Sequence, residues 1–597
     1  MAPSPSVRLT TTGLFIGLIA YAVWQGQFVP LQRERDSASA ELSFRLVERA
    51  AAKGLRFKHS SAKLDPKLQH IEVQVAGLGA AVSAFDANGD GWCDLYATSS
   101  AFGQPNALFL NQRDGSFRDV AAEAGVAMLN IPGRGASMGS VWADLDNDGD
   151  ADGLLYRYGF PALLKNELIE TGQLRFRELG AEAGLERWMN SNGATFLDFD
   201  RDGLLDLFIT AYFREEIDLW NLKSTRIMQD SFEFAKNGGR NYLYRNLGNL
   251  HFADVSETHL PPNSRWTLAA AAADLDGDGW QDLYIANDYG PEEFLINRGG
   301  KRFELAKGAG LEESSKSGMA VTLGDVQGTG SLGVYVTNIS KTGYLFQGNN
   351  LRLNRMESGA GFVNVAEGDV LDCGWSWGAQ FGDFDNDGRP DLVVLNGFVS
   401  ADTDRDYWYA MTKLGGAQGE LVEDAAHWPD QGTRSLSGYE RSRLLLNEST
   451  PKRVKFRDVA PAAGLNDLLD GRAAALGDFR HAGALDLAIA NQRAALLYYE
   501  NTPDPARHWI QLDLVGTRSN RDAIGAHVEI RFGDQRCAAV VLSASGFCAQ
   551  NERALHFGLG AATRVDEARI RWPSGAEQVI KDLAGGTRHR IEEPKQP

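Results

Sequence analysis

Oxygen-bearing side chains at fixed positions in short loops are the feature of this sequence that can do chemistry. The nine-residue pattern D-x-[DN]-x-D-G-x-x-D occurs five times nearly intact, starting at Asp86, Asp144, Asp198, Asp274 and Asp383. Oxygens at positions 1, 3 and 5 converge on one point, a backbone carbonyl at position 7 and a carboxylate at position 9 complete the cage, and the glycine makes the sharp turn. A cage of oxygens alone favours calcium over softer metals, and magnesium is seldom held by protein ligands alone. The pattern therefore predicts about five calcium ions.

The predicted ligands follow from their positions in the pattern, where position 7 contributes only its backbone carbonyl. They are Asp86, Asn88, Asp90, Trp92 and Asp94; Asp144, Asp146, Asp148, Asp150 and Asp152; Asp198, Asp200, Asp202, Leu204 and Asp206; Asp274, Asp276, Asp278, Trp280 and Asp282; and Asp383, Asp385, Asp387, Arg389 and Asp391. At positions 1, 3, 5 and 9 they include 19 carboxylates, which repel strongly without a divalent ion. We expect calcium to be structural.

Two degenerate copies of the pattern start at Asp325 and Asp478. The first has Gln327, Thr329 and Gly333 where the intact copies carry carboxylates. In the second, Arg480 occupies position 3, where its own cation can take the place of a metal ion. We predict that neither copy binds calcium.

The elements that position these loops are short strands. Each loop follows small and apolar residues and precedes a strand-like run such as LYATS, LFITAY or LVVLN, whereas an EF-hand would need a glutamate at position 12 and flanking helices. A second pattern, an aromatic residue followed by A-G-[LV], alternates with the loops. Its first copy, near Phe44, has no loop before it, and the loop at Asp478 has no copy after it. This offset predicts an all-β, seven-bladed β-propeller that an N-terminal strand closes.

Length and composition agree with several β-rich domains. A chain of 597 residues is too long for one core, and its 65 glycines indicate many turns. Residues 507–592 alternate apolar and polar side chains, as in WIQLDLV and AHVEIRF, which predicts a small β-sandwich-like domain. The expected domains are an anchor or signal peptide at 1–36, the propeller at 37–502 and the C-terminal domain at 503–597. A net charge of −19 argues against nucleic acid as the partner.

The N-terminal segment and the cysteines bear on the compartment. Residues 9–28 are apolar and fit a signal peptide, with Ala20-Tyr21-Ala22 as the cleavage site, or a single-pass membrane anchor, which we favour slightly. Both place the rest of the chain outside the cytoplasm. No C-x-x-C pair exists among the four cysteines, and Cys537 and Cys548 are candidates for a disulfide in an oxidising compartment.

Four motifs near the C-terminus carry a resemblance to a known family. They are NRDAIGA at 520–526, SGFCAQN at 545–551, LHFGLG at 555–560 and RWPSG at 571–575. Together they resemble the ASPIC/UnbV domain, and the loop repeats resemble the FG-GAP/VCBS type of integrin α-subunit propellers. The combination is similar to the cartilage acidic protein family over roughly residues 40–592. The resemblance implies a calcium-binding propeller in a secreted or envelope protein, and it implies no particular reaction.

Candidate catalytic residues are few. Ser137 lies in a G-x-S-x-G sequence, but equivalent small residues precede the other loops and no helix follows, so we reject it as a nucleophile. His59 and Asp288 are the candidate acid–base groups, and a structural role is the alternative for His59. Five residues that end equivalent strands could ring the mouth of the channel: Asn287, Asp288, Asn338, Asn396 and Asn491. The four asparagines among them could instead serve as turn residues.

Two insertions, at about 211–240 and 397–442, follow strands that leave a calcium loop, so we expect both on the opposite face of the propeller. They carry Phe213, Trp220, Phe232, Tyr407, Trp408, Tyr409 and Trp428. Such aromatic residues are either anchors for a partner or local packing.

The leading functional hypothesis is a calcium-stabilised extracytoplasmic binding or scaffold protein of the cell envelope. It would recognise a protein or a glycan through the insert-bearing face, either alone or within a membrane complex to which residues 9–28 attach it. The alternative is an enzyme of secondary metabolism, with its pocket at the channel mouth or in the cleft between propeller and C-terminal domain.

Overall fold

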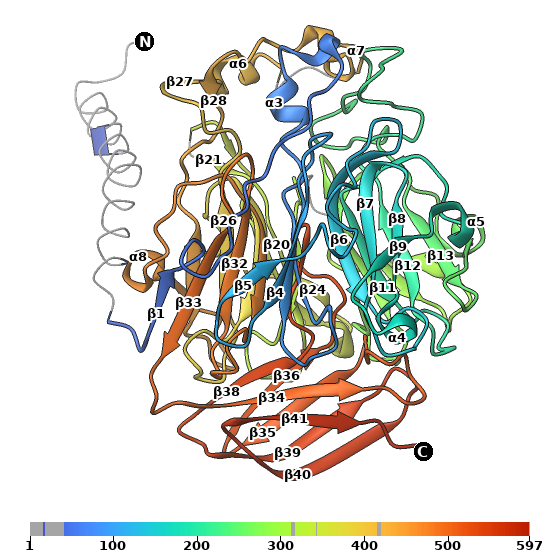
Figure 1. Ribbon diagram of the computed structural model, residues 1–597. Helices are drawn as coiled ribbons and strands as arrows, with labels where there is room; N and C mark the ends of the chain where they lie inside the picture. The colour runs from blue at the N-terminus through green and yellow to red at the C-terminus, as the bar shows by residue number, and fades with distance from the viewer. Residues whose placement is uncertain are drawn as a thin grey trace.

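The fold consists almost entirely of β-strands arranged around one axis (Figure 1). The computed structural model describes residues 16–17, 37, 41–311, 317–341, 343–414 and 419–595. The predicted all-β propeller class is confirmed.

Seven sheets in the described part of the chain share one antiparallel strand pattern. We number them by the chain order of their innermost strands. Sheet 1 contains β2 (Val82–Phe85), β3 (Asp94–Ala97), β4 (Ala107–Asn111) and β5 (Phe117–Asp119); sheet 2 contains β6 (Gly135–Ala143), β7 (Asp152–Gly159), β8 (Ala162–Asn166), β9 (Phe176–Glu178) and β10 (Met189–Asn190); sheet 3 contains β11 (Gly193–Leu197), β12 (Asp206–Thr210), β13 (Tyr242–Asn246) and β14 (Phe252–Asp254); sheet 4 contains β15 (Trp266–Ala273), β16 (Asp282–Asp288), β17 (Glu293–Asn297) and β18 (Phe303–Leu305). Sheet 5 contains β19 (Val321–Gly324), β20 (Gly333–Val336), β23 (Asn350–Arg355) and β24 (Gly361–Asn364); sheet 6 contains β25 (Ser376–Gly382), β26 (Asp391–Asn396), β29 (Arg443–Asn447) and β30 (Phe456–Asp458); sheet 7 contains β31 (Gly471–Gly477), β32 (Asp486–Asn491), β33 (Leu497–Pro503) and β1 (Phe44–Glu48).

The innermost strands form a closed ring. Strands β2, β6, β11, β15, β19, β25 and β31 contact one another in that order, and β31 contacts β2. The predicted N-terminal closing strand is confirmed, because β1 pairs with β33 from Phe44 opposite Pro503 to Glu48 opposite Tyr499. We interpret this ring as a seven-bladed propeller.

Small residues on the innermost strands allow this close approach. A Cβ added to Gly378 in β25 would lie 2.2 Å from the carbonyl oxygen of Arg472 in β31. Strand β15 (WTLAAAAA) and strand β31 (GRAAALG) are rich in alanine and glycine for the same reason.

The C-terminal residues form two further sheets that pack across one end of the ring (Figure 1). One contains β38 (Leu555–Gly560), β34 (His508–Val515) and β41 (Thr587–Glu592); the other contains β36 (Gln535–Val540), β35 (His527–Phe532), β39 (Arg564–Arg571) and β40 (Glu577–Ala584). We keep the division into 1–36, 37–502 and 503–597 as a proposal.

One loop of the C-terminal domain enters the centre of the ring. This segment, residues 541–554, is called the plug. Its strand β37 (Ala549–Gln550) pairs in parallel with β2, with Val82 opposite Ala549 and Ser83 opposite Gln550. Gln550 also accepts a hydrogen bond from the Trp142 N–H (2.9 Å) and donates to the Trp142 carbonyl (2.8 Å). The channel of the ring is therefore filled by a segment of the same chain.

The described residues of three segments cover the opposite end of the ring (Figure 1): 62–78, 211–240, and 397–414 with 419–442. We call them the cap. Its regular elements are η2 (Pro66–Leu68), α3 (Glu72–Val75), β27 (Asp402–Asp406), α6 (Trp408–Thr412), α7 (Glu420–Glu423), η5 (Ala425–His427) and β28 (Arg434–Ser435), and the hairpin β21 (Ser340–Lys341)–β22 (Leu345–Phe346) lies beside α6. The segments hold one another, because Leu222 N–H donates to Asp65 (2.8 Å) and the His70 ring contacts the Ala425 carbonyl oxygen (2.8 Å). Short helices elsewhere are α4 (Leu168–Thr171), η3 (Gly180–Ala183), α5 (Ser256–His259), η4 (Met356–Ser358) and α8 (Ala460–Ala463).

The N-terminal anchor or signal peptide predicted at residues 9–28 lies outside the described residues, except for Ile16 and Gly17. Within the described residues, the search for a helix of the length and apolar character that a membrane span requires finds none.

The candidate disulfide is not formed. All four cysteines lie in the described part of the chain, and all four are buried and free. Cys548 belongs to the plug and donates to the Asn192 carbonyl at 3.3 Å, whereas Cys537 lies in β36 of the C-terminal domain. The plug carries Cys548 into the ring and away from Cys537.

Candidate metal centres

Each acidic loop connects the innermost strand of its sheet to the next strand. We number the loops with their sheets: loop 1 is 86–94, loop 2 is 144–152, loop 3 is 198–206, loop 4 is 274–282, loop 5 is 325–333, loop 6 is 383–391 and loop 7 is 478–486. In all seven described loops the N–H at position 6 donates to the carboxylate at position 1, over 2.7 to 3.1 Å. In all seven loops that residue is a glycine with positive φ, for example +86° at Gly203. The first aspartate therefore shapes the loop as well as facing its centre.

The carboxylate at position 9 is held just as firmly. In loop 3, Asp206 accepts hydrogen bonds from the N–H groups of Phe199 (3.1 Å) and Asn246 (2.8 Å), and its side chain is fully buried. Loops 1, 2, 4 and 6 repeat this arrangement at Asp94, Asp152, Asp282 and Asp391. These backbone contacts fix the orientation of the position-9 carboxylate within each of these loops.

Four of the five predicted sites bring their carboxylates together. In each of four groups, one oxygen per residue lies within 4.8 Å of the others: Asp144, Asp146 and Asp148; Asp198, Asp200 and Asp206; Asp274, Asp276 and Asp282; and Asp383, Asp385 and Asp391. At positions 5 of these loops, Asp202, Asp278 and Asp387 accept from the N–H at position 7. Within the described residues no such group forms in loop 1, where Asn88 replaces an aspartate and donates to Asp90 (3.2 Å).

The clustered carboxylates are crowded together and largely withdrawn from solvent. Burial, and then neighbouring carboxylates, raise the pKa of Asp144 to about 8 and that of Asp198 to about 7. Burial likewise raises the pKa of Asp282 to about 8. One oxygen each of Asp146, Asp150 and Asp200 is buried without a hydrogen-bond partner among the residues that the structure describes. Hard oxygens that are unpaired and crowded fit a divalent cation such as calcium.

Position 7 differs in character from loop to loop, as expected if only its backbone serves the site. The Trp92 ring stacks on the His481 ring at 3.9 Å, and the Arg201 guanidinium lies 4.1 Å from the centre of the Trp280 ring. Leu204 is half-buried, and Arg389 forms an ion pair with Asp387. Their backbone carbonyls remain predicted ligands.

Loop 7 contains the cation expected there. The Arg480 guanidinium forms two hydrogen bonds with Asp486 at position 9, of 2.7 and 2.9 Å. In loop 5, Gln327 instead donates to the carbonyls of Thr450 and Pro451 (3.3 and 3.2 Å) and accepts from Arg355 (2.6 Å). Both degenerate loops are therefore closed by contacts within the chain.

A ring of asparagines next to the loops was missed by the sequence analysis. In each described sheet of the ring, an asparagine at or near the end of the third strand donates its side-chain N–H to the position-2 carbonyl of the preceding loop, over 2.6 to 3.1 Å. These asparagines are Asn111, Asn166, Asn246, Asn297, Asn354, Asn447 and Asn501. The signal was present in the sequence, because runs such as LFLN, LLKN, LYRN and LLLN recur once per repeat.

The loops lie between the ring and the C-terminal domain. Asp383 in loop 6 accepts from the Gly558 N–H at 3.1 Å, and Asp385 pairs with Arg507 at 2.6 Å. In loop 2 the Asp144 N–H donates to Asp522 at 2.9 Å. Metal binding in these loops would therefore bear directly on the docking of the C-terminal domain.

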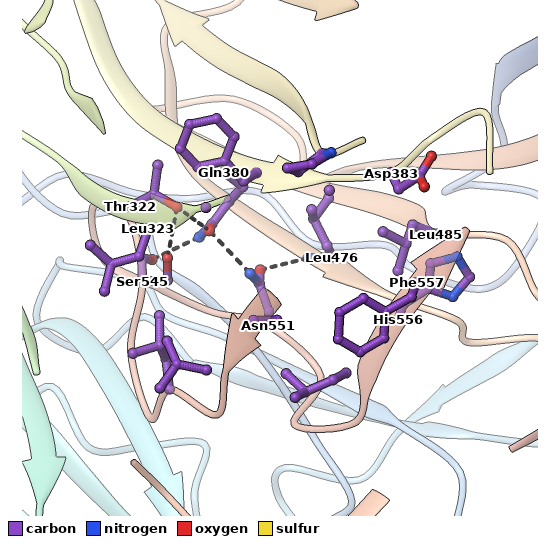
Figure 2. Close-up of a pocket in the computed structure, with 18 of the residues that line it drawn as sticks. Thr322, Leu323, Gln380, Asp383, Leu476, Leu485, Ser545, Asn551, His556 and Phe557 are labelled. Carbon is purple, nitrogen blue, oxygen red and sulfur yellow. Dashed lines mark hydrogen bonds between the residues drawn. The ribbon is translucent and has the colours of Figure 1, made fainter. Parts of the chain in front are cut away.

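A small cavity of about 150 Å³ lies at this junction, between sheets 5, 6 and 7 and the C-terminal domain. Figure 2 shows its polar side, where Gln380 donates to the Ser545 carbonyl (2.7 Å) and accepts from Asn551 (3.0 Å). Leu323, Leu476 and Phe557 line its apolar side.

The candidate acid–base residues are engaged in structural contacts. The two ring nitrogens of His59 contact Ser100 Oγ and the Arg493 N–H, both at 3.1 Å, and burial with two nearby arginines lowers its pKa to about 3. Asp288 accepts from the Tyr212 hydroxyl at 2.8 Å, and burial raises its pKa to about 6. Ser137 is buried within β6, which continues to Ala143 without a helix.

The four asparagines are buried, and Asn287, Asn396 and Asn491 lie at the last or next-to-last position of a strand. Asn287 donates to the Pro291 carbonyl and Asn491 to that of Ala495, both at 2.9 Å. Asn396 donates to the Cys373 carbonyl (2.9 Å), and the fully buried Asn338 side chain donates to the Val336 carbonyl (3.4 Å).

The aromatic residues of the two inserts mainly pack within the cap. Phe213, Tyr407, Trp408 and Trp428 are buried, and Trp220 and Phe232 are partly buried. Tyr409 differs, since 73% of its surface is exposed. Local packing, and not a role as partner anchors, is therefore the better description of Phe213, Trp220, Phe232, Tyr407, Trp408 and Trp428.

Comparisons with known proteins agree with the resemblance noted in the sequence. Residues 516–597 match the ASPIC and UnbV family, and residues 86–155, 232–285 and 274–336 match an FG-GAP-like repeat. The chain is 29% identical to cartilage acidic protein 1 of Xenopus tropicalis over 185 residues and 29% identical to that of Homo sapiens over 192 residues. Each match covers 31% of this chain, and 25% and 24% of the respective relatives. The V. cholerae biofilm matrix protein Bap1 overlaps 89% of this chain and 75% of its own at 9% identity, with a TM-score of 0.29.

Proposed function

We propose that this chain of FG-GAP-like repeats and an ASPIC/UnbV domain is a calcium-stabilised, extracytoplasmic binding or scaffold protein. The observation that carries the calcium proposal is the convergence of buried carboxylates in loops 2, 3, 4 and 6. Loop 1 would complete the set of five with Asp86, Asn88, Asp90 and Asp94. The extracytoplasmic location is supported by the similarity to cartilage acidic protein 1 and by the apolar residues 9–28.

The calcium proposal is tested by calorimetric melting of the chain in calcium and in chelator. Calcium should raise the melting temperature strongly, because the bound ion stabilises only the folded loops. The substitution Asp198→Asn should reduce this increase, and Asp114→Asn, which changes an exposed aspartate outside the loops, should not. Equal melting temperatures in calcium and chelator would reject the proposal.

We place the partner-binding surface beside the cap. Tyr344, Leu345, Phe346 and Tyr409 are exposed by 50%, 37%, 52% and 73% of their surface, and we call them the aromatic patch. The Tyr344 ring stacks on the Trp408 ring at 5.5 Å, which joins the hairpin to α6. Large exposed aromatic side chains of this kind favour a protein or glycan partner.

Photo-crosslinking tests this surface. A photoreactive phenylalanine analogue at position 409 or 346 should capture a specific partner from envelope extracts, whereas the same analogue at the exposed Val579 of β40 should not. Tyr409→Ala should reduce capture from position 346. Equal capture from positions 409, 346 and 579 would argue against the patch.

The alternative function is an enzyme of secondary metabolism. At the cap end of the channel, Arg472 donates to the carbonyls of Gly77, Gly397 and Phe398 and lies over the Trp377 ring. The buried Phe547 of the plug packs against the same ring. These side chains occupy the place where a pocket at the channel mouth was expected, so the junction cavity of Figure 2 is where this alternative would find a substrate.

A further inference from the structure

Loop 2 gathers more carboxylates than the other acidic loops. Its position 7 is itself an aspartate, Asp150, and Glu170 of α4 faces it. Oxygens of Asp148, Asp150 and Glu170 lie within 4.8 Å of one another, and this group is distinct from that of Asp144, Asp146 and Asp148. Two adjoining groups therefore share Asp148.

Asp150 supplies an independent sign of a missing partner. Its residue is only 4% exposed. One of its carboxylate oxygens accepts from the Ile169 N–H at 2.9 Å, and the other is buried without a partner among the described residues. Leaving a charged oxygen buried and unpaired is costly, so the geometry favours a cation at this position.

The balance of charge points the same way. In loops 1, 3 and 6, three or four carboxylates would face one divalent ion and one arginine. These arginines, Arg113, Arg245 and Arg507, lie 2.6 to 2.9 Å from a carboxylate oxygen of their loop. Around loop 2, six carboxylates would face one divalent ion and the Lys165 ammonium, which lies 3.2 Å from Asp146 and 2.5 Å from Glu170. Arg521, 3.6 Å from Asp144, adds one more positive charge. An excess of negative charge remains that a second divalent ion would neutralise.

We propose that loop 2 binds a second divalent cation, calcium in the first instance, through the side chains of Asp148, Asp150 and Glu170. This proposal rests on calcium binding by the acidic loops. Asp148 bridges the two ions, and water completes the outer site, because Glu170 is solvent-exposed and calcium accepts irregular, partly hydrated coordination. Lys165 competes with the outer ion for Glu170.

The test is to count the calcium bound to the purified chain by native mass spectrometry after dialysis against calcium. The substitution Asp150→Asn retains the backbone carbonyl at position 7 and an oxygen that accepts from the Ile169 N–H. The substitution Glu170→Gln changes a residue outside loop 2, so the inner site keeps all of its predicted ligands there. The double variant should bind one ion fewer than the wild type, whereas Glu182→Gln, at an exposed residue paired with Arg177, should bind the same number. Lys165→Met should bind the outer ion more tightly, so that it is retained at a lower calcium concentration.

The outcomes separate this inference from the proposed function. If Asp198→Asn loses an ion but the Asp150→Asn/Glu170→Gln variant keeps the full number, the outer site is rejected and the calcium loops stand. If no variant and not even the wild type binds calcium, both proposals fail. Unchanged retention in Lys165→Met likewise counts against the outer site, and this variant removes no ligand on which folding could depend.

Discussion

Asn246 illustrates how one side chain connects two acidic loops. Its backbone N–H donates to Asp206 of loop 3, and its side-chain N–H group donates to the carbonyls of Leu205 (3.0 Å) and of Leu145 in loop 2 (2.9 Å). An amide suits this position because it offers two donors to two buried carbonyls. The side-chain bond to the preceding loop recurs in each described sheet of the ring, so the asparagines join every loop to the next.

We expect Asn246→Ala to destabilise the chain by about 1–3 kcal/mol, because two buried carbonyls would lose their donor. The free energy of unfolding in urea measures this change. Asn466→Ala, at an exposed asparagine outside the ring, should change it by less than about 0.5 kcal/mol. Equal effects of the two substitutions would contradict the role of the asparagine ring.

Arg480 places a positive charge in loop 7, where we propose that the intact loops bind calcium. Asp486 is fully buried, and the Arg480 guanidinium donates two hydrogen bonds to that carboxylate and a third to the Asn501 carbonyl (2.6 Å). Arg480→Met should therefore cost about 3–5 kcal/mol, since it leaves a buried carboxylate without its cation. The loss should be the same in calcium and in chelator, as measured by urea unfolding.

The control for this prediction is Arg113→Met, which breaks the more exposed pair with Asp90 in loop 1. We expect it to cost less than about 1 kcal/mol in calcium. A loss in Arg480→Met that calcium restores would mean that loop 7 binds an ion after all.

At the scale of elements, the plug is the feature that unites the two parts of the chain. Ser543 accepts from the Phe196 N–H in β11 (2.8 Å), Gly546 N–H donates to Val321 in β19 (2.7 Å), and Glu552 accepts from Asp478 N–H (2.8 Å). One segment of the C-terminal domain therefore pairs with several innermost strands at once. Such contacts make separate unfolding of the two parts unfavourable.

We expect Phe547→Ala to destabilise the ring and the C-terminal domain together. The side chain is fully buried and packs against the Trp377 ring at 5.4 Å, so its removal should cost about 3–5 kcal/mol. Calorimetry should show one transition, shifted to lower temperature, and Val579→Ala on the exposed face of β40 should leave it in place. Two separate transitions in the wild type would contradict this coupling.

The repeats made the ring and its loops predictable, whereas the plug and the cap depend on contacts distant in sequence. The loop pattern identified the carboxylates of loops 2, 3, 4 and 6, because backbone geometry within nine residues determines how they converge. Ala549 and Val82 are paired in a parallel strand pair although they lie far apart in the chain. Such a pairing cannot be predicted from a local sequence pattern. In the sequence, Tyr407, Trp428 and Tyr409 look alike, as aromatic residues of the second insertion. Tertiary packing alone decides that Tyr407 and Trp428 are buried whereas Tyr409 is exposed.

At the scale of the whole molecule, the acidic loops lie at the surface on which the C-terminal domain rests. Asp383 and Asp144 face their proposed ions on one side and bond to Gly558 and Asp522 on the other. Without ions, repulsion within each loop would weaken these contacts. Calcium would therefore stabilise the insertion of the plug as well as the ring itself.

This coupling predicts that chelation loosens the plug before the C-terminal sheets unfold. Backbone amides of the plug, such as those of Gly546 and Glu552, are held only by strands or strand ends of the ring. Their hydrogen exchange should accelerate by about tenfold or more in chelator, the effect of about 1.4 kcal/mol of lost stability. Amides of β35 bonded to β36 and β39, around Val528 and Ile530, are the matched control, because their partners lie within the C-terminal domain. If β35 accelerates as much as the plug, calcium acts on the fold of the whole domain, and if neither segment changes, the loops do not control docking.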